Sequence, residues 1–267
     1  MTNAFSGIVA RSFGAIDKDV DYIGTDGLWH CGRCGKAKQK YIHCLDRDWL
    51  VGFVCECQID NDKAKQAERE KKIKERLHDC FGDSTAHSAP DDDANSRRTG
   101  ACKKYAETFT RKSRWLVLFG DIGTGKSYRA AQICKDVIKR DFTAKFTTLG
   151  EIERELWDND KVEVYRNLER YDLLVLDDFG AERQTQYTAE IRYNVIDMRY
   201  NSGKPLIITT NIKKFDSDDL ADKRVFSRIK ERSLFMKYEG EDRRNGTKPL
   251  DKAEIEKLLT EDGWEDL

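Results

Sequence analysis

The sequence predicts an α/β fold in which helices cover a parallel sheet, preceded by a small cysteine-rich module and a charged helix. Three observations point to this arrangement. Short apolar runs alternate with longer amphipathic stretches in the C-terminal part of the chain. Five of the eight cysteines lie between Cys31 and Cys57, and a stretch that is charged almost throughout separates the two regions.

The composition excludes several classes of protein. The chain has 267 residues, of which 39% are hydrophobic and 36% charged, a balance too polar for a membrane protein and too apolar for a disordered one. No apolar run approaches the about 20 residues that span a bilayer, and residues 1–11 are too weakly apolar for a secretory signal. We therefore expect a soluble, cytoplasmic protein. Because the net charge is −1, any nucleic-acid surface has to be a local patch.

Changes in composition divide the chain into four parts. The first holds the cysteine cluster, and the second begins as an exposed charged helix and continues as a polar, acidic linker over residues 82–100. Opposite charges four residues apart, such as Glu68 and Lys72, favour that helix. The third part is the α/β core and the fourth a C-terminal helix or tail. The expected boundaries are 1–60, 61–100, 101–250 and 251–267.

The apolar runs of the third part are the expected strands. Their short length and their content of Val, Ile and Leu are typical of strands buried on both faces. The stretches between them, for example 127–140 and 189–200, have helix-like content, so the sheet is expected to be parallel. The expected strands are 115–119, 144–149, 172–177, 205–210 and 233–238.

A glycine-rich segment between the first expected strand and the next helix predicts a phosphate site. Its glycines let the backbone turn N–H groups toward phosphates, and the following helix adds its positive end. The lysine is placed to reach the β- and γ-phosphates and the serine hydroxyl to bind Mg²⁺. The alternative is a chance glycine-rich turn, but the expected strand before the segment and the expected helix after it favour the phosphate site. The segment comprises Gly120, Asp121, Ile122, Gly123, Thr124, Gly125, Lys126 and Ser127.

Polar residues end two further strands. Asp177 and Asp178 follow four apolar residues, so Asp177 is placed to hold Mg²⁺ and Asp178 to polarise an attacking water. Asn211 ends the strand 205–210, where it could orient that water and sense the γ-phosphate. The alternatives are two carboxylates that only cap a strand and an asparagine that only forms a turn.

The segments GDIGTGKS, LLVLDDFGAER and PLIITTN, in this order and spacing, resemble the DnaC/IstB-like branch of the AAA+ ATPases. This branch contains replicative helicase loaders and transposition helper ATPases, and the resemblance covers most of residues 101–238, about half of the chain. It implies that Lys126 and Ser127 form the Walker A pair, Asp177 and Asp178 the Walker B pair, and Asn211 sensor 1. Many relatives carry Glu where this chain has Asp178, which leaves the turnover rate open.

The resemblance also implies two arginine roles. Arg228 falls where the family places an arginine finger that reaches the ATP of a neighbouring subunit, and Arg224, one turn earlier, is the other candidate. The alternative is that both arginines simply lie on the solvent-exposed face of an amphipathic helix. Arg244, or its neighbour Arg243, resembles sensor 2.

Two close cysteine pairs predict a closed, structural zinc site with Cys31, Cys34, Cys55 and Cys57 as ligands. Cys44 or His43 could replace Cys55 or Cys57, and reduced cysteines in a small core are the alternative. Aromatic and basic residues around the pairs could form a surface for bases and phosphates, unless the aromatics form the core of the module. They are Trp29, Tyr41, Trp49, Phe53, Arg33, Lys36, Lys38 and Lys40.

Together these features predict a DNA replication protein that binds ATP, Mg²⁺ and Zn²⁺. The resemblance implies a slow ATPase, stimulated by DNA or assembly, that oligomerises on ATP and binds single-stranded DNA and the replicative helicase. A transposition helper that binds duplex DNA and a transposase remains open as an alternative. So does a nucleotide-gated adaptor with little hydrolysis.

Overall fold

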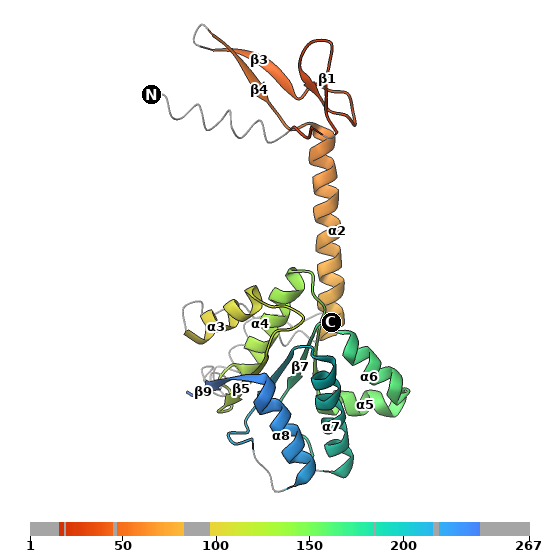
Figure 1. Ribbon diagram of the computed structural model, residues 1–267, viewed down its shortest axis with the longest axis vertical. Coiled ribbons are helices and arrows are strands. Elements are labelled where there is room, and N and C mark those ends of the chain that lie inside the picture. The colour runs from red at the N-terminus through yellow and green to blue at the C-terminus, as the bar shows by residue number, and fades with distance from the viewer. Residues whose placement is uncertain are drawn as a thin grey trace, which may run out of the picture. The chain divides into compact units, whose positions relative to one another are not determined.

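The computed structural model describes residues 16–18, 20–44, 47–82, 97–183, 185–215 and 219–240 (Figure 1). The chain divides into two units, Met1–Lys72 and Ile73–Leu267. The predicted C-terminal helix or tail and residues 83–96 of the predicted linker lie outside the described residues. No helix in the described part of the chain is both long and apolar enough to cross a membrane.

The second unit contains a five-stranded parallel sheet with the strand order β6-β7-β8-β5-β9. Every neighbouring pair is parallel, with Leu116 opposite Ile207 and Phe146 opposite Val175, for example. This confirms the predicted fold class and the five predicted strands. The strands are β5 (Trp115–Gly120), β6 (Ala144–Thr148), β7 (Leu173–Asp177), β8 (Leu206–Thr210) and β9 (Ser233–Tyr238).

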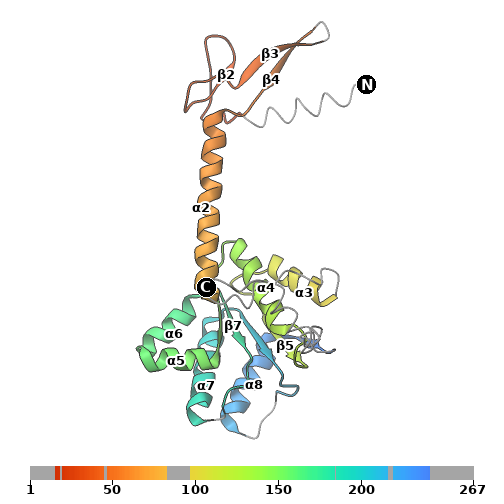
Figure 2. The ribbon, with the colours of Figure 1, turned by 180° about the vertical axis from the view of Figure 1, so that it is seen from behind.

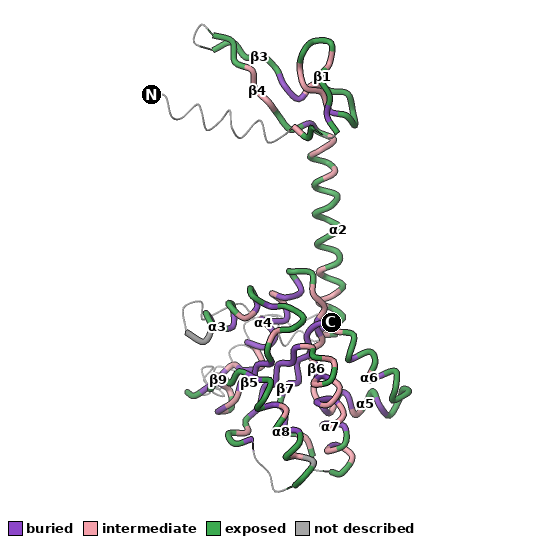
Figure 3. The backbone as a smooth tube through the Cα atoms, in the orientation of Figure 1, coloured by how far each residue is buried: buried purple, intermediate pink, exposed green. Residues whose placement is uncertain are grey.

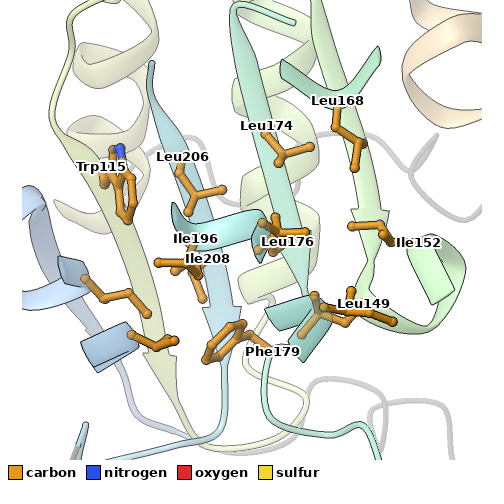
Figure 4. Close-up of a cluster of buried hydrophobic side chains, with 14 of the residues drawn as sticks. Trp115, Leu149, Ile152, Leu168, Leu174, Leu176, Phe179, Ile196, Leu206 and Ile208 are labelled. Atoms are coloured by element: carbon orange, nitrogen blue, oxygen red, sulfur yellow. The ribbon is translucent and has the colours of Figure 1, made fainter. Parts of the chain in front are cut away.

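Helices cover both faces of this sheet, and Figures 1 and 2 show α3 and α4 grouped apart from α5 to α8. Alternate strand residues point to opposite faces, so the three central strands β7, β8 and β5 each supply apolar side chains to two clusters, whereas the edge strands β6 and β9 supply one of them. Leu174 and Ile208 pack with α5 to α8 (Figure 4), whereas Val175 and Ile207 pack with α3, α4 and the end of α2. The helices are α2 (Glu56–Phe81), α3 (Arg97–Glu107), α4 (Lys126–Lys139), α5 (Leu149–Asp158), α6 (Lys161–Arg170), α7 (Gln186–Ser202) and α8 (Leu220–Arg232).

Local signals explain where several helices begin and end. Thr148 and Thr185 are the N-cap residues of α5 and α7, and each forms a capping box with the residue three positions later. Helix α7 ends at Gly203, whose left-handed φ of 67° suits glycine. Helix α3 begins at Arg97, so the last residues of the predicted linker are helical.

The predicted charged helix is confirmed as α2, most of which is exposed (Figure 3). Lys72 Nζ lies 2.6 Å from Glu68 Oε1, the predicted pair of opposite charges four residues apart. The helix begins at Glu56, earlier than expected, and therefore includes Cys57. Its last turns belong to the second unit, where Ile73, Leu77 and Cys80 pack in the cluster with α3 and α4.

The described part of the first unit contains two short antiparallel pairs of strands, followed by the first turns of α2 up to Lys72. β1 (Tyr22–Ile23) pairs with β2 (Trp29–His30), and β3 (Gln39–Cys44) forms a hairpin with β4 (Arg47–Gly52). Among the described residues of this unit, the buried apolar side chains are those of Cys31 and Cys55 alone. The exposed fractions of Tyr41, Trp49 and Phe53 are 65%, 37% and 38%, so these aromatics do not form a core, and that alternative reading was wrong.

Candidate functional site

The predicted phosphate loop connects β5 to α4 at the carboxyl edge of the sheet. At Gly120 the backbone φ is 131°, and a Cβ atom there would lie 2.0 Å from the carbonyl oxygen of Tyr238 in the neighbouring strand. Asp121 N donates to that same oxygen over 2.9 Å. Gly125, with φ of 87°, directly precedes the first turn of α4. Only glycine fits both positions, and the backbone forms the open cradle that phosphates require.

Lys126 lies at the start of α4, and its side chain is directed back across the loop. Its ammonium donates to Gly120 O over 3.1 Å, to Asp121 O over 2.6 Å and to Asn211 Oδ1 over 2.8 Å. The predicted Walker A lysine and the predicted sensor asparagine, 85 residues apart in the chain, are therefore in contact. Ser127 is half-buried in the same first turn.

The acidic pair ends β7, next to β8. Asp177 is buried, and its Oδ1 accepts a hydrogen bond from Thr209 Oγ1 over 2.5 Å. Asp178 N donates to the same hydroxyl over 3.0 Å, with the Asp178 side chain exposed and its φ at 51°. Aspartate tolerates this left-handed conformation better than most residues. Thr209 thus positions both acids, a role that its place within an apolar strand does not indicate.

A second bond ties the loop after β8 to the phosphate loop. Lys213 Nζ lies 2.8 Å from Asp121 Oδ1, and this hydrogen-bonded cation holds the pKa of the Asp121 carboxyl below its usual range. Ile122 is exposed, and Thr124 Oγ1 donates to Asp121 O over 2.8 Å. Sequence reasoning missed Lys213 because an isolated lysine in a turn carries no signal of its partner.

The two candidate arginine fingers have different surroundings on α8. Arg228 Nη2 lies 2.5 Å from Asp197 Oδ1, and its guanidinium is 5.1 Å and 5.3 Å from the ring centres of Tyr193 and Tyr200. Arg224, one turn earlier, is exposed. The structure therefore holds Arg228 against α7 of its own chain. Arg243 and Arg244 lie outside the described residues.

The first unit brings four cysteine sulfurs together. The Sγ atoms of Cys31, Cys34, Cys55 and Cys57 all lie within 4.8 Å of one another, and none of the four forms a disulfide. Hydrogen bonds from the backbone N–H groups of Cys34 and Arg33 lower the pKa of the Cys31 thiol, which favours the thiolate that a metal requires. A set of four thiols in such a cluster fits the donors of a closed zinc site.

The group of four sulfurs does not include the alternative candidates His43 and Cys44. His43 and Cys44 lie at the far end of β3, where His43 Nδ1 is 2.8 Å from Asp48 Oδ1. His30, next to the first cysteine pair, contacts Gly35 O and Asp26 through its two ring nitrogens, each over 2.9 Å. Neither histidine belongs to the group of four sulfurs found among the described residues.

One predicted surface residue of this unit is buried. Lys38 Nζ donates to Asp21 Oδ2 over 2.5 Å, and both side chains are only 2% exposed. Asp21 also accepts from Gly32 N over 3.3 Å, within the turn between Cys31 and Cys34. The prediction that Lys38 forms part of a phosphate surface was therefore wrong, because its charge serves an internal ion pair.

Comparison with known proteins agrees with this geometry. Residues 45–244 match the family described as IstB-like ATP binding protein. The chain is 26% identical over 134 residues to the replicative helicase loader DnaC of Escherichia coli (strain K12), covering 48% of this chain and 55% of that protein. It is 27% identical over 167 residues to the replicative helicase loader DnaI of Bacillus subtilis (strain 168), covering 55% of this chain and 52% of that protein. The chain thus spans about half the length of the curated relatives it matches.

Among solved structures, the fold is similar to that of a crystal structure described as a primosome component from Streptococcus pyogenes serotype M3. The two share 21% identity with a TM-score of 0.53, covering 65% of this chain and 98% of the other. The resemblance to the DnaC/IstB-like ATPases is confirmed, since the family match covers most of the chain. The chain belongs to the IstB-like ATP binding protein family.

Proposed function

We propose that this protein is an ATP-hydrolysing helicase loader of the AAA+ class, acting in DNA replication. The observation that carries the proposal is the contact of Lys126 with Asn211, next to the Asp177–Thr209 bond. Lys126 at the start of α4 thus contacts Asn211 after β8, and Asp177 ends the neighbouring strand β7 at the same carboxyl edge of the sheet, the usual ligand edge of open α/β folds. The names of the relatives DnaC and DnaI support the assignment to helicase loading.

In this proposal, the N–H groups of the phosphate loop and the Lys126 ammonium bind the triphosphate. Ser127 and Asp177 would hold Mg²⁺, which when bound would neutralise charge on the phosphates. The exposed Asp178 carboxylate polarises the attacking water and Asn211 orients it. Asp178 is one methylene shorter than glutamate, so we expect slow hydrolysis that DNA or assembly stimulates.

The interface arginine is Arg224 or Arg228, and the surroundings of the two favour Arg224. Arg228 would have to leave Asp197 and two tyrosine rings to reach a neighbouring subunit, whereas Arg224 is already exposed. We expect Arg224→Ala to abolish the stimulation of hydrolysis by assembly and Arg228→Ala mainly to lower stability. An unchanged Arg224→Ala enzyme together with an inactive Arg228→Ala enzyme would reverse this assignment.

The first unit would bind zinc through Cys31, Cys34, Cys55 and Cys57 and present a rigid surface to the partners. Those partners are the replicative helicase, single-stranded DNA and further copies of the chain when ATP is bound. The exposed aromatics Tyr41, Trp49 and Phe53 supply stacking groups for bases.

The proposal is tested by substituting the lysine of the phosphate loop. Because hydrogen bonds to charged groups contribute about 1.5–3 kcal/mol, Lys126→Ala should weaken ATP binding about 10- to 100-fold and abolish hydrolysis. The matched control is Lys139→Ala at the other end of α4, where the ammonium pairs with Asp136 in the same helix. Fluorescent ATP titration and phosphate release, with and without single-stranded DNA, provide the readouts. Equal ATP affinity of the parent and Lys126→Ala would refute a nucleotide site at this loop.

A transposition helper ATPase is the second candidate, because the family match carries the IstB-like description. A capture experiment with ATP-bound Asp178→Asn protein separates the two, since this variant should retain the assembled state. Recovery of a hexameric helicase supports loading, and recovery of a transposase on duplex DNA supports the alternative. Undetectable hydrolysis by the parent, with intact ATP binding, would instead indicate a nucleotide-gated adaptor.

A further inference from the structure

Helix α7 carries a buried arginine that contacts two other elements at the same time. Arg192 is only 5% exposed. Its Nη1 lies 3.1 Å from Glu182 Oε1, and its Nη2 lies 2.8 Å from Asp222 Oδ1. Glu182 follows the acidic pair of β7, and Asp222 lies in the first turn of α8. One guanidinium therefore connects the turn after the proposed hydrolysis site with α8, the helix that carries both candidates for the interface arginine.

On one side, Glu182 stabilises the turn that carries Asp178. Gly180 N donates to Glu182 Oε2 over 2.7 Å, and Ala181 N donates to Asp178 O over 3.0 Å. The turn is also packed tightly: a Cβ at Gly180 would lie 2.4 Å from Ile212, the residue after Asn211. The Glu182 carboxylate is thus bonded to the turn that begins at Asp178, and the side chain of Ile212 packs against the same turn.

On the other side, Asp222 anchors the start of α8. The backbone of Asp222 donates to Asp219 Oδ1 over 3.1 Å, so Arg192 binds the first, capped turn of this helix. Arg224 lies two residues further along. The Arg228–Asp197 pair joins the same two helices at 2.5 Å. Helices α7 and α8 are thus held by two ion pairs, only one of which also contacts the Asp178 turn.

We propose that Arg192 is a positioning residue that couples the Asp178 turn to α8, so that nucleotide-dependent changes at the turn set the position of Arg224. The inference rests on the proposed ATPase function. The chemistry requires arginine, since a planar guanidinium presents separate N–H groups to two carboxylates, whereas a lysine ammonium is a single point of charge. Because Arg192 and Glu182 are largely shielded from solvent, their attraction is stronger than that of a surface pair.

A second buried arginine of α7 provides a matched control. Arg199 is fully buried two turns further along, but it donates to backbone carbonyl oxygens at the amino edge of the sheet, among them Tyr171 O at 3.0 Å. Replacing the guanidinium of Arg199 should affect folding as much as replacing that of Arg192. Its hydrogen bonds go to the carbonyl oxygens of Glu169, Tyr171, Asp172 and Pro205, none of which belongs to the Asp178 turn or to α8.

The experiment compares Arg192→Lys with Arg199→Lys in the full chain, measuring ATP affinity, KM, kcat and thermal unfolding. We expect both variants to unfold at a lower temperature. Arg192→Lys alone should lower the assembly-stimulated kcat about tenfold, within the usual range of coupling between two sites, with ATP affinity and KM unchanged. In an Arg224→Ala background, Arg192→Lys should have no further effect on kcat, because the arginine that Arg192 is proposed to position is already missing.

A neutral triple variant keeps the test decisive if Arg192→Lys folds poorly. Glu182→Gln, Arg192→Met and Asp222→Asn together leave no unpaired buried charge, so this protein should fold yet show the same loss of kcat. Full kcat in a folded Arg192→Lys or triple variant would overturn the proposal, as would an equal loss in Arg199→Lys. The proposal would also be overturned if the loss of kcat in the Arg192→Lys, Arg224→Ala double variant equalled the product of the two single losses. If the parent itself fails to bind ATP, the proposed function is lost and this inference with it, which the affinity measurement shows separately.

Discussion

The two units of the chain are stabilised in different ways. In the second, side chains from every strand of the sheet pack into two apolar clusters, and Leu174, Val175 and Ile207 have no exposed surface. In the described part of the first, burial is confined to Cys31, Cys55 and the polar residues Asp21, Lys38 and Gln39. An apolar core thus stabilises the ATP-binding unit, whereas in the first unit a thiol cluster and a buried ion pair stand where such a core would be.

If the proposed zinc site is correct, this difference predicts that the first unit depends on a metal and the second does not. A small module that buries almost no aliphatic or aromatic surface gains too little from the hydrophobic effect to offset chain entropy. In the proposed zinc site, four converging thiols would provide the remaining stabilisation, because the free energy of metal binding becomes free energy of folding. The ATP-binding unit should be indifferent to chelators.

The largest expected effect is therefore removal of a metal ligand. Cys34→Ser should unfold the first unit, since structural zinc sites contribute apparent free energies of about 10–16 kcal/mol in zinc-finger peptides. The matched control is Cys44→Ser, because Cys44 is also exposed but lies outside the four-sulfur group. Metal content and peptide-resolved hydrogen exchange provide the readouts. A Cys34→Ser protein with full zinc and a protected β3–β4 hairpin would show that the cluster is not the stabilising element.

The sequence predicted those elements that depend on residues close together in the chain. Strands buried on both faces are continuous apolar runs, and the phosphate loop needs glycines next to one another in the chain. Both features can be read without knowledge of the fold. The four clustered cysteines were equally visible, because metal sites in small modules use ligands in close pairs.

The contacts that organise the site were not predictable in this way. Thr209 supports both acids across 31 and 32 residues, and Arg192 joins Glu182 to Asp222, yet each residue type is unremarkable at its position. The burial of Lys38 was contrary to expectation, because lysines are mostly exposed unless paired. Such contacts depend on which elements become neighbours, which no local pattern specifies.

Second in size is the loss of an apolar side chain from the core. Leu174→Ala in β7 should destabilise the ATP-binding unit by about 3–5 kcal/mol, the usual cost for a fully buried leucine. The same type of change in the hairpin, Ile42→Ala, should alter stability by less than about 0.5 kcal/mol, because Ile42 is exposed. Denaturant unfolding followed by hydrogen exchange assigns each change to its unit. Equal effects of the two substitutions would contradict the contrast between the units.

A smaller effect is expected at the buried ion pair. Lys38→Met leaves the Asp21 carboxylate buried without its cation, which should cost the first unit about 3 kcal/mol, the lower end of the range for such changes. Lys36→Met is the control, because the Lys36–Glu56 pair is exposed to solvent and should contribute little. Hydrogen exchange in the zinc-bound protein measures both. If Lys36→Met proved the more damaging change, the surface rather than the interior would stabilise this unit.

The two units should unfold at different pH values on acidification. Burial alone would raise the pKa of Asp172 in the second unit, but hydrogen bonds from Arg111 and Thr143 outweigh it and the pKa lies below its usual value. The same balance, with Lys38, Asp17 N and Gly32 N as donors, lowers the pKa of Asp21. A carboxyl group whose pKa is lower in the folded state stabilises fully above its ordinary pKa near 4, and that stability is lost as the pH falls through the folded value.

The thiols of the first unit respond to acid earlier than these carboxylates. Protons compete with a metal for thiolates, and free thiols bind protons at a far higher pH than carboxyl groups do. On acidification, the first unit should therefore open while Asp172 is still ionised, and the ATP-binding unit should follow only below about pH 4. Pulsed hydrogen exchange across a pH series resolves the two transitions. After chelation at neutral pH the first transition should be absent, because the unit is already open, so a single shared midpoint in the metal-bound protein would refute the idea that the two units are stabilised by different means.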